Sequence, residues 1–224
     1  MVFILKEEVR IRYMNDLNLG VYLVTGQEYS KGRSTLDIVT RAIAGGIGTV
    51  QLREKGMSTR ELVELGRQVR SITREKGIIF LVNDRVDVAL AVEADGVHLG
   101  QDDMPLIDAR RILGEQAVIG LSVDTPEEAA AAAEEGASYV GLGPVFKTGT
   151  KSDTGPVVGP QGVEVVSSRI NIPLVAIGGI TGKNMVEVLQ AGADSVAIVS
   201  ALTAAEDIEA AAKEMTAAFN AVKG

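Results

Sequence analysis

Short apolar runs alternate with amphipathic stretches along most of the chain, and this alternation is the strongest pattern in the sequence. Eight such runs, rich in β-branched residues, occupy residues 21–25, 48–53, 79–83, 95–100, 118–122, 138–143, 173–178 and 194–199. Between the runs, apolar residues fall three or four positions apart, as Leu62, Leu65 and Val69 do, which places them on one face of a helix. The pattern therefore predicts eight strands separated by helical segments.

Two sets of similar sequences alternate among these eight runs. The first set begins at residues 48, 95, 138 and 194, with spacings of 43 to 56 residues, and the second begins at residues 21, 79, 118 and 173. Such spacings are near twice the roughly 30-residue βα unit. The runs are continuously apolar, as strands buried on both faces are. These features predict an α/β protein built as a (β/α)8 TIM barrel, because an open flavodoxin-like sheet would leave strands over.

Composition and charge favour a single domain and disfavour some classes of partner. The chain has 224 residues, of which 46% are hydrophobic, so we expect a single barrel domain over residues 20–224. A net charge of −8 and the absence of Trp disfavour binding to nucleic acid. Cysteine is also absent, which excludes a disulfide framework and a thiolate zinc site.

Residues 1–19 differ from the rest of the chain in their mixture of apolar and charged positions. This mixture predicts an amphipathic leader helix outside the barrel. Charges from Lys6 to Arg12 interrupt any apolar segment before it reaches the length of a signal sequence or a membrane span. We therefore expect no membrane partner and a cytoplasmic location, whereas the sequence leaves open whether the chain forms a homo-oligomer.

Polar residues follow most of the predicted strands, at the rim where barrel enzymes place their active sites. These rim residues are Thr25, Gln51, Arg53, Lys55, Asn83, Asp84, Gln101, Asp102, Asp103, Ser122, residues 148–151, Gly178, Gly179, Val199 and Ser200. The segment from Asn83 to Asp103 connects two neighbouring strands, so its carboxylates are predicted to lie at the same rim.

Two interpretations of these carboxylates are open. Asp84 and one of Asp102 or Asp103 supply oxygen ligands from neighbouring strands, which suits Mg²⁺ that retains waters and binds a substrate phosphate. Alternatively, Asp84 caps a helix that starts near Arg85, and Asp103 caps one that starts at Pro105.

Cations and glycines at the rim indicate anion binding. Arg53, Lys55 and Lys151 could neutralise a diphosphate, and Lys151 lies in a Gly-rich loop whose hydroxyls and amides can surround an anion. Gly178 and Gly179 end the seventh predicted strand, where barrels commonly bind phosphate, although a tight turn would also need glycine.

His98 is the only histidine of the chain. It lies inside a predicted strand between two apolar residues, so alternation points it to the opposite face from them. This position favours a hydrogen-bonding histidine in the core or at the rim, and we assign it no catalytic role.

Six motifs, taken in their order and spacing, closely resemble the thiamine-phosphate synthase family over about residues 20–210. They are Gln51-Leu-Arg-Glu-Lys55, Val82-Asn-Asp84, Asp95-Gly-Val-His-Leu-Gly-Gln-Asp-Asp103, Gly141-Leu-Gly-Pro-Val-Phe146, Thr148-Gly-Thr-Lys151 and Ile177-Gly-Gly-Ile-Thr181. The resemblance implies a transferase that joins a hydroxymethylpyrimidine diphosphate to a thiazole phosphate, with Mg²⁺ as cofactor. It also implies a dissociative mechanism, in which diphosphate departs before the thiazole nitrogen attacks the pyrimidine methylene cation.

The resemblance also implies roles for individual residues, with Asp84 and Asp103 as the Mg²⁺ ligands. The residues expected around the pyrimidine diphosphate are Gln51, Arg53, Lys55, Asn83, Ser122 and Lys151, of which Arg53, Ser122 and Lys151 are the catalytic candidates. Those expected around the thiazole phosphate are Thr148, Thr150, Gly179, Val199 and Ser200. Asp124 is a departure from the pattern of the family and receives no role.

Three other functions remain to be weighed against this transferase. The first is a thiazole-phosphate tautomerase, since such relatives keep the barrel but lack parts of the diphosphate and Mg²⁺ set, which looks complete here. The second is a Schiff-base aldolase that uses Lys55 or Lys151. The third is a non-catalytic barrel that binds a phosphorylated metabolite. Borohydride trapping would identify the aldolase, and tight binding without turnover would identify the third.

Overall fold

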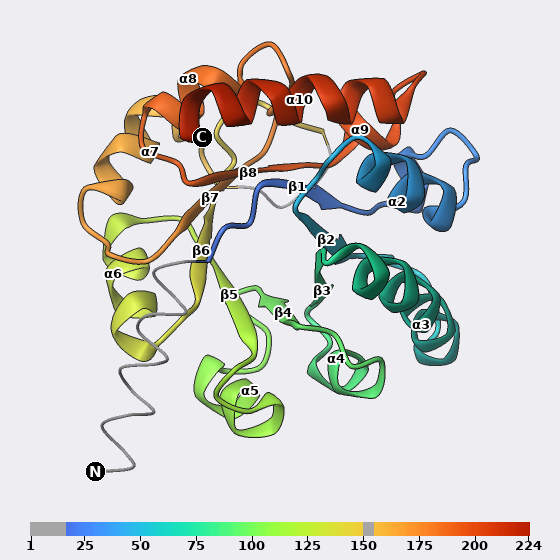
Figure 1. Cartoon of the computed structure of the whole chain (residues 1–224). Helices are drawn as coiled ribbons and strands as arrows, with labels where there is room; N and C mark the ends of the chain where they lie inside the picture. Colours follow the sequence, from blue (N-terminus) through green and yellow to red (C-terminus); the bar gives the residue numbers. More distant parts are fainter. Residues whose placement is uncertain (1–16, 150–154) are drawn as a thin grey trace.

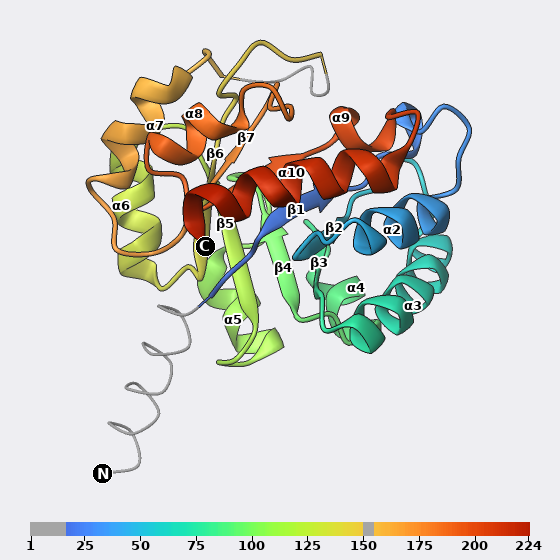
Figure 2. The same cartoon turned by 45° about the horizontal axis from the view of Figure 1, so that its top comes forward.

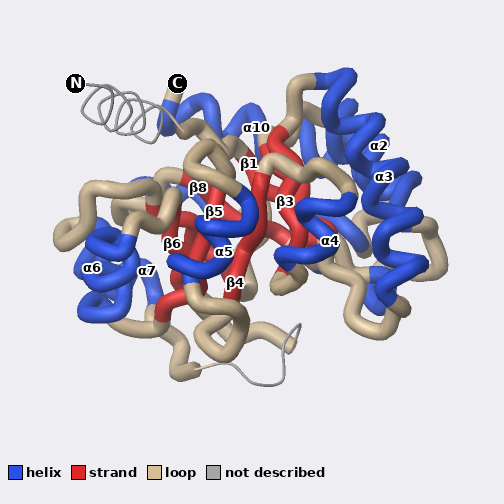
Figure 3. The backbone as a smooth tube through the Cα atoms, turned by 90° about the horizontal axis from the view of Figure 1, so that it is seen from below, coloured by secondary structure: helices blue, strands red, loops and turns tan. Residues whose placement is uncertain are grey.

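Eight parallel strands form a closed barrel at the centre of the protein, in a computed structural model that describes residues 17–149 and 155–224. The strands follow one another around the barrel in chain order, and helices surround them (Figure 3). The strands are β1 (Val21–Val24), β2 (Thr49–Leu52), β3 (Ile79–Asn83), β4 (Gly96–Leu99), β5 (Val118–Val123), β6 (Tyr139–Leu142), β7 (Leu174–Ile177) and β8 (Ser195–Ile198). Each lies within or beside one of the eight predicted runs, so the predicted (β/α)8 TIM barrel is confirmed.

Helices follow the strands and pack around the outside of the barrel (Figure 1). They are α2 (Thr35–Ala44), α3 (Thr59–Lys76), α4 (Val86–Ala91), α5 (Leu106–Leu113), α6 (Pro126–Glu135), α7 (Gly159–Ser167), α8 (Met185–Gln190), α9 (Ser200–Thr203) and α10 (Ile208–Lys223), with a short 3-10 helix, η1 (Gln27–Tyr29), after β1.

Local sequence signals set the ends of the longer helices. Ser58 and Glu61 form a capping box at the start of α3, and Gly77 ends that helix in the left-handed conformation. Thr125 caps α6 through its side chain, Pro126 occupies the first turn, and Gly136 ends the helix in the same left-handed way.

Two apolar cores result from the alternation of side chains along the strands. The larger core lies between the barrel and the helices, and the smaller core fills the barrel interior. The buried members of the interior core are Leu19, Tyr22, Val24, Leu81, Val118, Tyr139, Val175 and Ala197. Glycines and polar residues occupy several of the remaining inward positions, so the barrel interior also has room for a hydrogen-bonded network.

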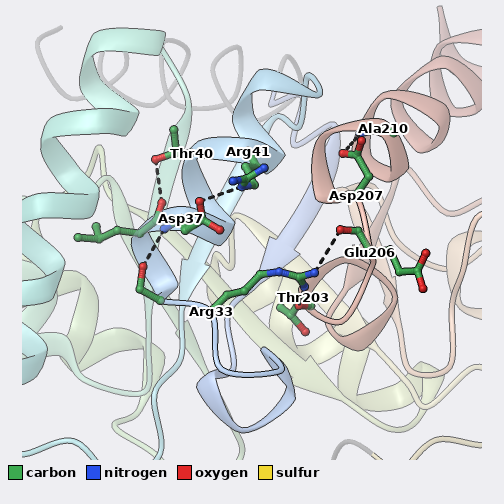
Figure 4. Close-up of polar contacts among 10 residues, drawn as sticks. Arg33, Asp37, Thr40, Arg41, Thr203, Glu206, Asp207 and Ala210 are labelled. Atoms are coloured by element: carbon green, nitrogen blue, oxygen red, sulfur yellow. Dashed lines mark hydrogen bonds and ion pairs between the residues drawn. The ribbon is translucent and has the colours of Figure 1, made fainter.

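The first and last βα units are tied together on one side of the barrel. Helix α10 packs against both α2 and α8, and it also contacts β1, which it crosses in Figure 2. Arg33, just before α2, donates hydrogen bonds to the backbone oxygens of Thr203 at 3.4 Å and Glu206 at 3.1 Å (Figure 4). These bonds join the loop after β1 to the connection between α9 and α10, and so fix two loops that border the rim.

The predicted leader helix falls almost entirely outside the described residues. Within residues 17–19, Leu19 is buried in the interior core of the barrel and Leu17 packs against that core. The Leu19 backbone oxygen also accepts a hydrogen bond of 2.7 Å from the Thr49 hydroxyl. Among the described residues, no helix is both long and apolar enough to cross a membrane.

Candidate active site

Asp84 and Asp103 come together at the rim, after β3 and after β4. Asp84 adopts a left-handed backbone conformation, with φ of 61°, and its backbone N–H donates to the His98 oxygen at 2.8 Å. Asp103 is held by a turn in which its Oδ2 accepts a hydrogen bond of 2.7 Å from the Gly100 N–H. The two carboxyl groups are close enough to form a hydrogen bond with each other. The prediction that these two carboxylates lie together at the rim is therefore confirmed.

Neither aspartate caps the helix that follows it, so the capping interpretation does not hold for α4 or α5. The N-cap of α4 is Arg85 and the N-cap of α5 is Pro105, and no side-chain cap bond is present at either helix. One Asp103 oxygen serves the turn at Gly100, whereas Asp84 accepts no capping bond that would explain its position.

Burial raises the pKa of Asp84 to about 6, and the neighbouring Asp103 adds to the rise by its hydrogen bond and its charge. The positive charges of Lys55 and Arg53 oppose this rise. A carboxyl group with a raised pKa, next to a second carboxyl group and two cations, is typical of a functional site rather than of a solvated surface.

The pair fits the donor set of Mg²⁺. Carboxylate oxygens are the ligands this ion prefers, and a bound cation would favour the ionised form of Asp84, which burial and the neighbouring Asp103 disfavour. Within residues 17–149 and 155–224, no group of three or more His, Cys, Asp or Glu residues is arranged to hold a metal. A site with only two protein carboxylates suits Mg²⁺ in particular, because this ion completes its coordination with waters and substrate phosphates.

The loop after β2 carries the cations and is anchored by a buried carboxylate. The backbone N–H of Arg53 donates to the Thr25 hydroxyl at 2.9 Å. Glu54, almost fully buried, accepts hydrogen bonds from the Gln27 N–H at 2.8 Å and the Thr35 hydroxyl at 2.9 Å. Anchoring at Glu54 leaves Arg53 half-buried and Lys55 exposed at the rim. The role of Glu54 was missed by sequence reasoning, since a buried glutamate between two cations is not visible as such in the sequence.

The loop after β7 is built differently, from glycine backbone. Gly178 and Gly179 have φ of 98° and 66°, values that favour glycine. A Cβ on Gly178 would lie 2.6 Å from the Pro144 Cα, and one on Gly179 would lie 2.8 Å from the Lys147 oxygen. The turn and the close approach to the loop after β6 therefore both require glycine. This requirement does not exclude phosphate binding there.

The other residues predicted to bind the thiazole phosphate lie near the ends of β6 and β8. Val199 precedes the four-residue helix α9 and is half-buried, and Ser200 opens that helix and is exposed. Thr148 is half-buried in the loop after β6. Thr150 and Lys151 lie outside the described residues, so their predicted roles stay predictions.

Gln51, His98 and Ser122 are joined inside the barrel by two tyrosines that sequence reasoning did not single out. Gln51 contacts Tyr22, Tyr22 contacts Tyr139, and His98 bridges Tyr139 and Ser122. The expected hydrogen-bonding histidine is thus present. The signal that could have found the tyrosines is the glycine inside two strands, Gly120 and Gly141, because such glycines mark a close approach.

Comparison with known proteins shows one family over most of the chain. Residues 21–202 match the family described as "Thiamine monophosphate synthase". The thiamine-phosphate synthase of Haloquadratum walsbyi is 50% identical over 200 residues, which cover 88% of this chain and 90% of that protein. The thiamine-phosphate synthase of Moorella thermoacetica is 45% identical over 204 residues, which cover 91% and 97% of the two chains.

Solved structures agree with the sequence relatives. Thiamine phosphate pyrophosphorylase from Pyrococcus furiosus superposes with a TM-score of 0.85 at 40% identity, covering 92% of this chain and 98% of that one. Tryptophan synthase from Mycobacterium tuberculosis has a TM-score of 0.66 at 16% identity, covering 95% and 97%. The second likeness concerns the barrel fold alone.

Proposed function

Because the chain belongs to the thiamine-phosphate synthase family, we propose that its barrel joins 4-amino-2-methyl-5-hydroxymethylpyrimidine diphosphate to a thiazole phosphate. The products are thiamine phosphate and diphosphate. A transferase of this kind must bind two anionic substrates at one rim and stabilise a diphosphate leaving group. The observation that carries the proposal is the carboxyl pair of Asp84 and Asp103 beside Arg53 and Lys55.

Asp84 and Asp103 would hold Mg²⁺, which supplies Lewis-acid stabilisation of the charge that develops on the departing diphosphate. Arg53 offers a planar fork to two phosphate oxygens, and Lys55 and Lys151 add mobile positive charges. In a site shielded from water, each such donor can contribute roughly 10²–10³-fold in rate. No general acid or base is needed for this step, because the bond to diphosphate breaks before the new bond forms and the developing charge is neutralised by the cations.

The pyrimidine ring is assigned to the side chains on the inner wall of the rim. Gln51 is hydrogen-bonded to Tyr22 and Ser122 to His98, and these bonds orient both side chains. Asn83 ends β3 directly before Asp84, where its amide can contact the same substrate. Ordered polar groups of this kind orient the ring so that its methylene faces the thiazole nitrogen.

The thiazole phosphate is assigned to the opposite part of the rim. Backbone N–H groups at Gly179, Val199 and Ser200 offer neutral donors to a phosphate, together with the hydroxyls of Thr148 and Thr150. A binding site made of backbone donors places the second anion away from the carboxyl pair and its cations.

A thiazole-phosphate tautomerase is the second function to separate from this one, since it would use the same barrel and the same thiazole half. Such a protein has no use for a carboxyl pair beside two cations. The relatives named thiamine-phosphate synthase also support the transferase.

The test is an assay of the full chain with both substrates, in Mg²⁺ and in excess chelator, with mass spectrometry of the organic product. We expect thiamine phosphate and diphosphate only when both substrates and Mg²⁺ are present. Isomerisation of the thiazole phosphate without the pyrimidine substrate would overturn the proposal in favour of the tautomerase.

A further inference from the structure

A chain of four hydrogen bonds crosses the interior of the barrel and connects two residues of the proposed pyrimidine site. The Gln51 Nε2 lies 2.6 Å from the Tyr22 hydroxyl, which lies 2.9 Å from the Tyr139 hydroxyl. Tyr139 lies 2.9 Å from the His98 Nδ1, and the His98 Nε2 lies 3.0 Å from the Ser122 Oγ. The five residues come from β2, β1, β6, β4 and β5, so only closure of the barrel brings them together.

The barrel leaves space for this chain at two glycines. A Cβ on Gly120 would lie 2.1 Å from the Tyr139 Cζ, and a Cβ on Gly141 would lie 2.9 Å from the His98 Cε1. The His98 and Tyr139 rings stack with their centroids 5.5 Å apart. No side chain other than hydrogen could occupy these two inward positions without moving the rings.

The donors and acceptors of the chain fit together in one direction when it is followed from Gln51. An amide nitrogen only donates, so the Tyr22 oxygen accepts from Gln51. Tyr22 is fully buried, and burial raises the pKa of both tyrosines, which keeps their hydroxyls protonated. The Tyr22 hydrogen therefore goes to Tyr139, the only other hydrogen-bond partner that Tyr22 has in the described part of the chain. The hydrogen of Tyr139 is then directed to His98 Nδ1.

We propose that this directional chain fixes His98 in the neutral form that carries its proton on Nε2, and thereby makes the Ser122 hydroxyl a hydrogen-bond donor toward the bound substrate. His98 Nε2–H donates to the Ser122 oxygen, which leaves the Ser122 hydrogen to point into the site. His98, Tyr139 and Tyr22 are then positioning residues that act through Ser122. The substrate atom opposite Ser122 must be an acceptor, such as a ring nitrogen or a phosphate oxygen.

The same hydrogen-bond chain links two properties of the site: whether the residue at position 51 donates or accepts, and whether Ser122 does. While Gln51 donates to Tyr22 through its nitrogen, its carboxamide oxygen is left to accept from the ligand. If the group at position 51 accepted from Tyr22 instead, every bond of the chain would reverse, and Ser122 would donate to His98. The site would then lose its donor at Ser122, although the shape of the barrel would be unchanged.

The inference rests on the proposed function only in giving Ser122 a substrate contact, so its central test needs neither substrate nor turnover. His98 is the sole histidine, and the ¹⁵N-histidine spectrum of the full chain reports its protonation without overlap. We expect the Nε2–H form in the unmodified protein. Observation of the Nδ1–H form would overturn the proposal.

A substitution at Gln51, the other end of the hydrogen-bond chain, gives the sharper result. Gln51→Glu places an acceptor beside Tyr22 once the new carboxyl group ionises, and we expect His98 to change to the Nδ1–H form. The double variant Gln51→Glu with Tyr22→Phe interrupts the chain and should restore the Nε2–H form. Retention of Nε2–H in Gln51→Glu at every pH between about 6 and 9 would overturn the inference.

Kinetics of a double-mutant cycle test whether the tyrosine acts through Ser122. We expect Ser122→Ala and Tyr139→Phe each to lower kcat/KM roughly tenfold, and the double variant to be no worse than Ser122→Ala alone within about twofold. Effects that multiply would overturn the positioning role. Val175→Ala, a substitution in the same interior core that removes none of the hydrogen-bonding groups, controls for general loosening of the barrel, and we expect it to lower the unfolding temperature without changing kcat/KM.

Discussion

The rim after β2, β3 and β4 and the rim after β7 and β8 are two halves of one candidate site, and they differ in the chemical groups that form them. The first half uses charged side chains, with Asp103 close enough to Asp84 to raise the pKa of Asp84. The second half uses backbone, with two glycines in conformations and contacts that a side chain would disturb. A cation and its diphosphate suit the first half, whereas a phosphate ester suits the second. Substitutions should therefore affect activity in the first half and the fold in the second.

The largest effect is expected from removal of the carboxyl pair. Asp84→Ala combined with Asp103→Ala should lower kcat/KM on the order of 10³-fold or more, because the leaving diphosphate loses its bound cation. Initial rates of diphosphate release measure this effect. The control is Asp102→Ala, which removes an exposed aspartate next to the pair and should leave the rate near that of the unmodified protein. Retained turnover in the double variant would remove the metal role of the pair.

The backbone half is tested by Gly179→Ala. A left-handed conformation and a contact of 2.8 Å with the Lys147 oxygen should together lower the free energy of unfolding by roughly 2–4 kcal/mol. Gly77→Ala is the matched control, because Gly77 has the same φ of 66° but no neighbour within 4 Å, and it should cost only about 1–2 kcal/mol. Denaturant unfolding of the two variants measures the difference. Equal losses of unfolding free energy in the two variants would mean that the close approach of Gly179 to the loop after β6 does not contribute to stability.

A single cation should matter less than the pair. Lys55→Ala should raise the KM for the pyrimidine diphosphate roughly tenfold and leave the KM for the thiazole phosphate unchanged, because the lysine is a mobile charge in the first half only. Lys76→Ala removes an exposed lysine of α3 that pairs with Glu75 at 2.9 Å, and it should change neither constant. An equal rise in both KM values for Lys55→Ala would contradict the division of the rim.

The smallest effect is a pH dependence of stability in chelator. The pKa of Asp84, raised to about 6, means that the folded chain keeps a proton which the unfolded chain has lost between about pH 4 and pH 6. Asp84 therefore destabilises the metal-free fold increasingly as pH rises through that window, and the contribution is constant above it.

Asp84→Asn should remove this contribution and still accept the left-handed backbone. Discounted for solvent screening, it should stabilise the metal-free protein by on the order of 1 kcal/mol at pH 7.5, about 2–4 °C in Tm, and by almost nothing near pH 4. Thermal unfolding of both proteins across this pH range measures the difference. A gain that is equal at all pH values would show that the Asp84 charge is not its cause.

Local patterns predicted the barrel, whereas contacts across the barrel were out of their reach. Apolar runs such as residues 79–83 identify strands because both faces of each strand are buried. Asp84 and Asp103 were also predictable as rim residues, but the exclusion of helix capping needed the actual starts of α4 and α5. Sequence could not supply the Tyr22–Tyr139 contact, since it joins residues separated by 117 positions.

Binding of the two anions to one variant tests the division of the rim most directly. Asp84→Asn combined with Asp103→Asn keeps the size of both side chains but removes their charges. Isothermal titration should show that the variant loses the Mg²⁺-dependent binding of inorganic diphosphate and retains the binding of thiazole phosphate. Retention of Mg²⁺-dependent diphosphate binding, or loss of both ligands together, would contradict the account.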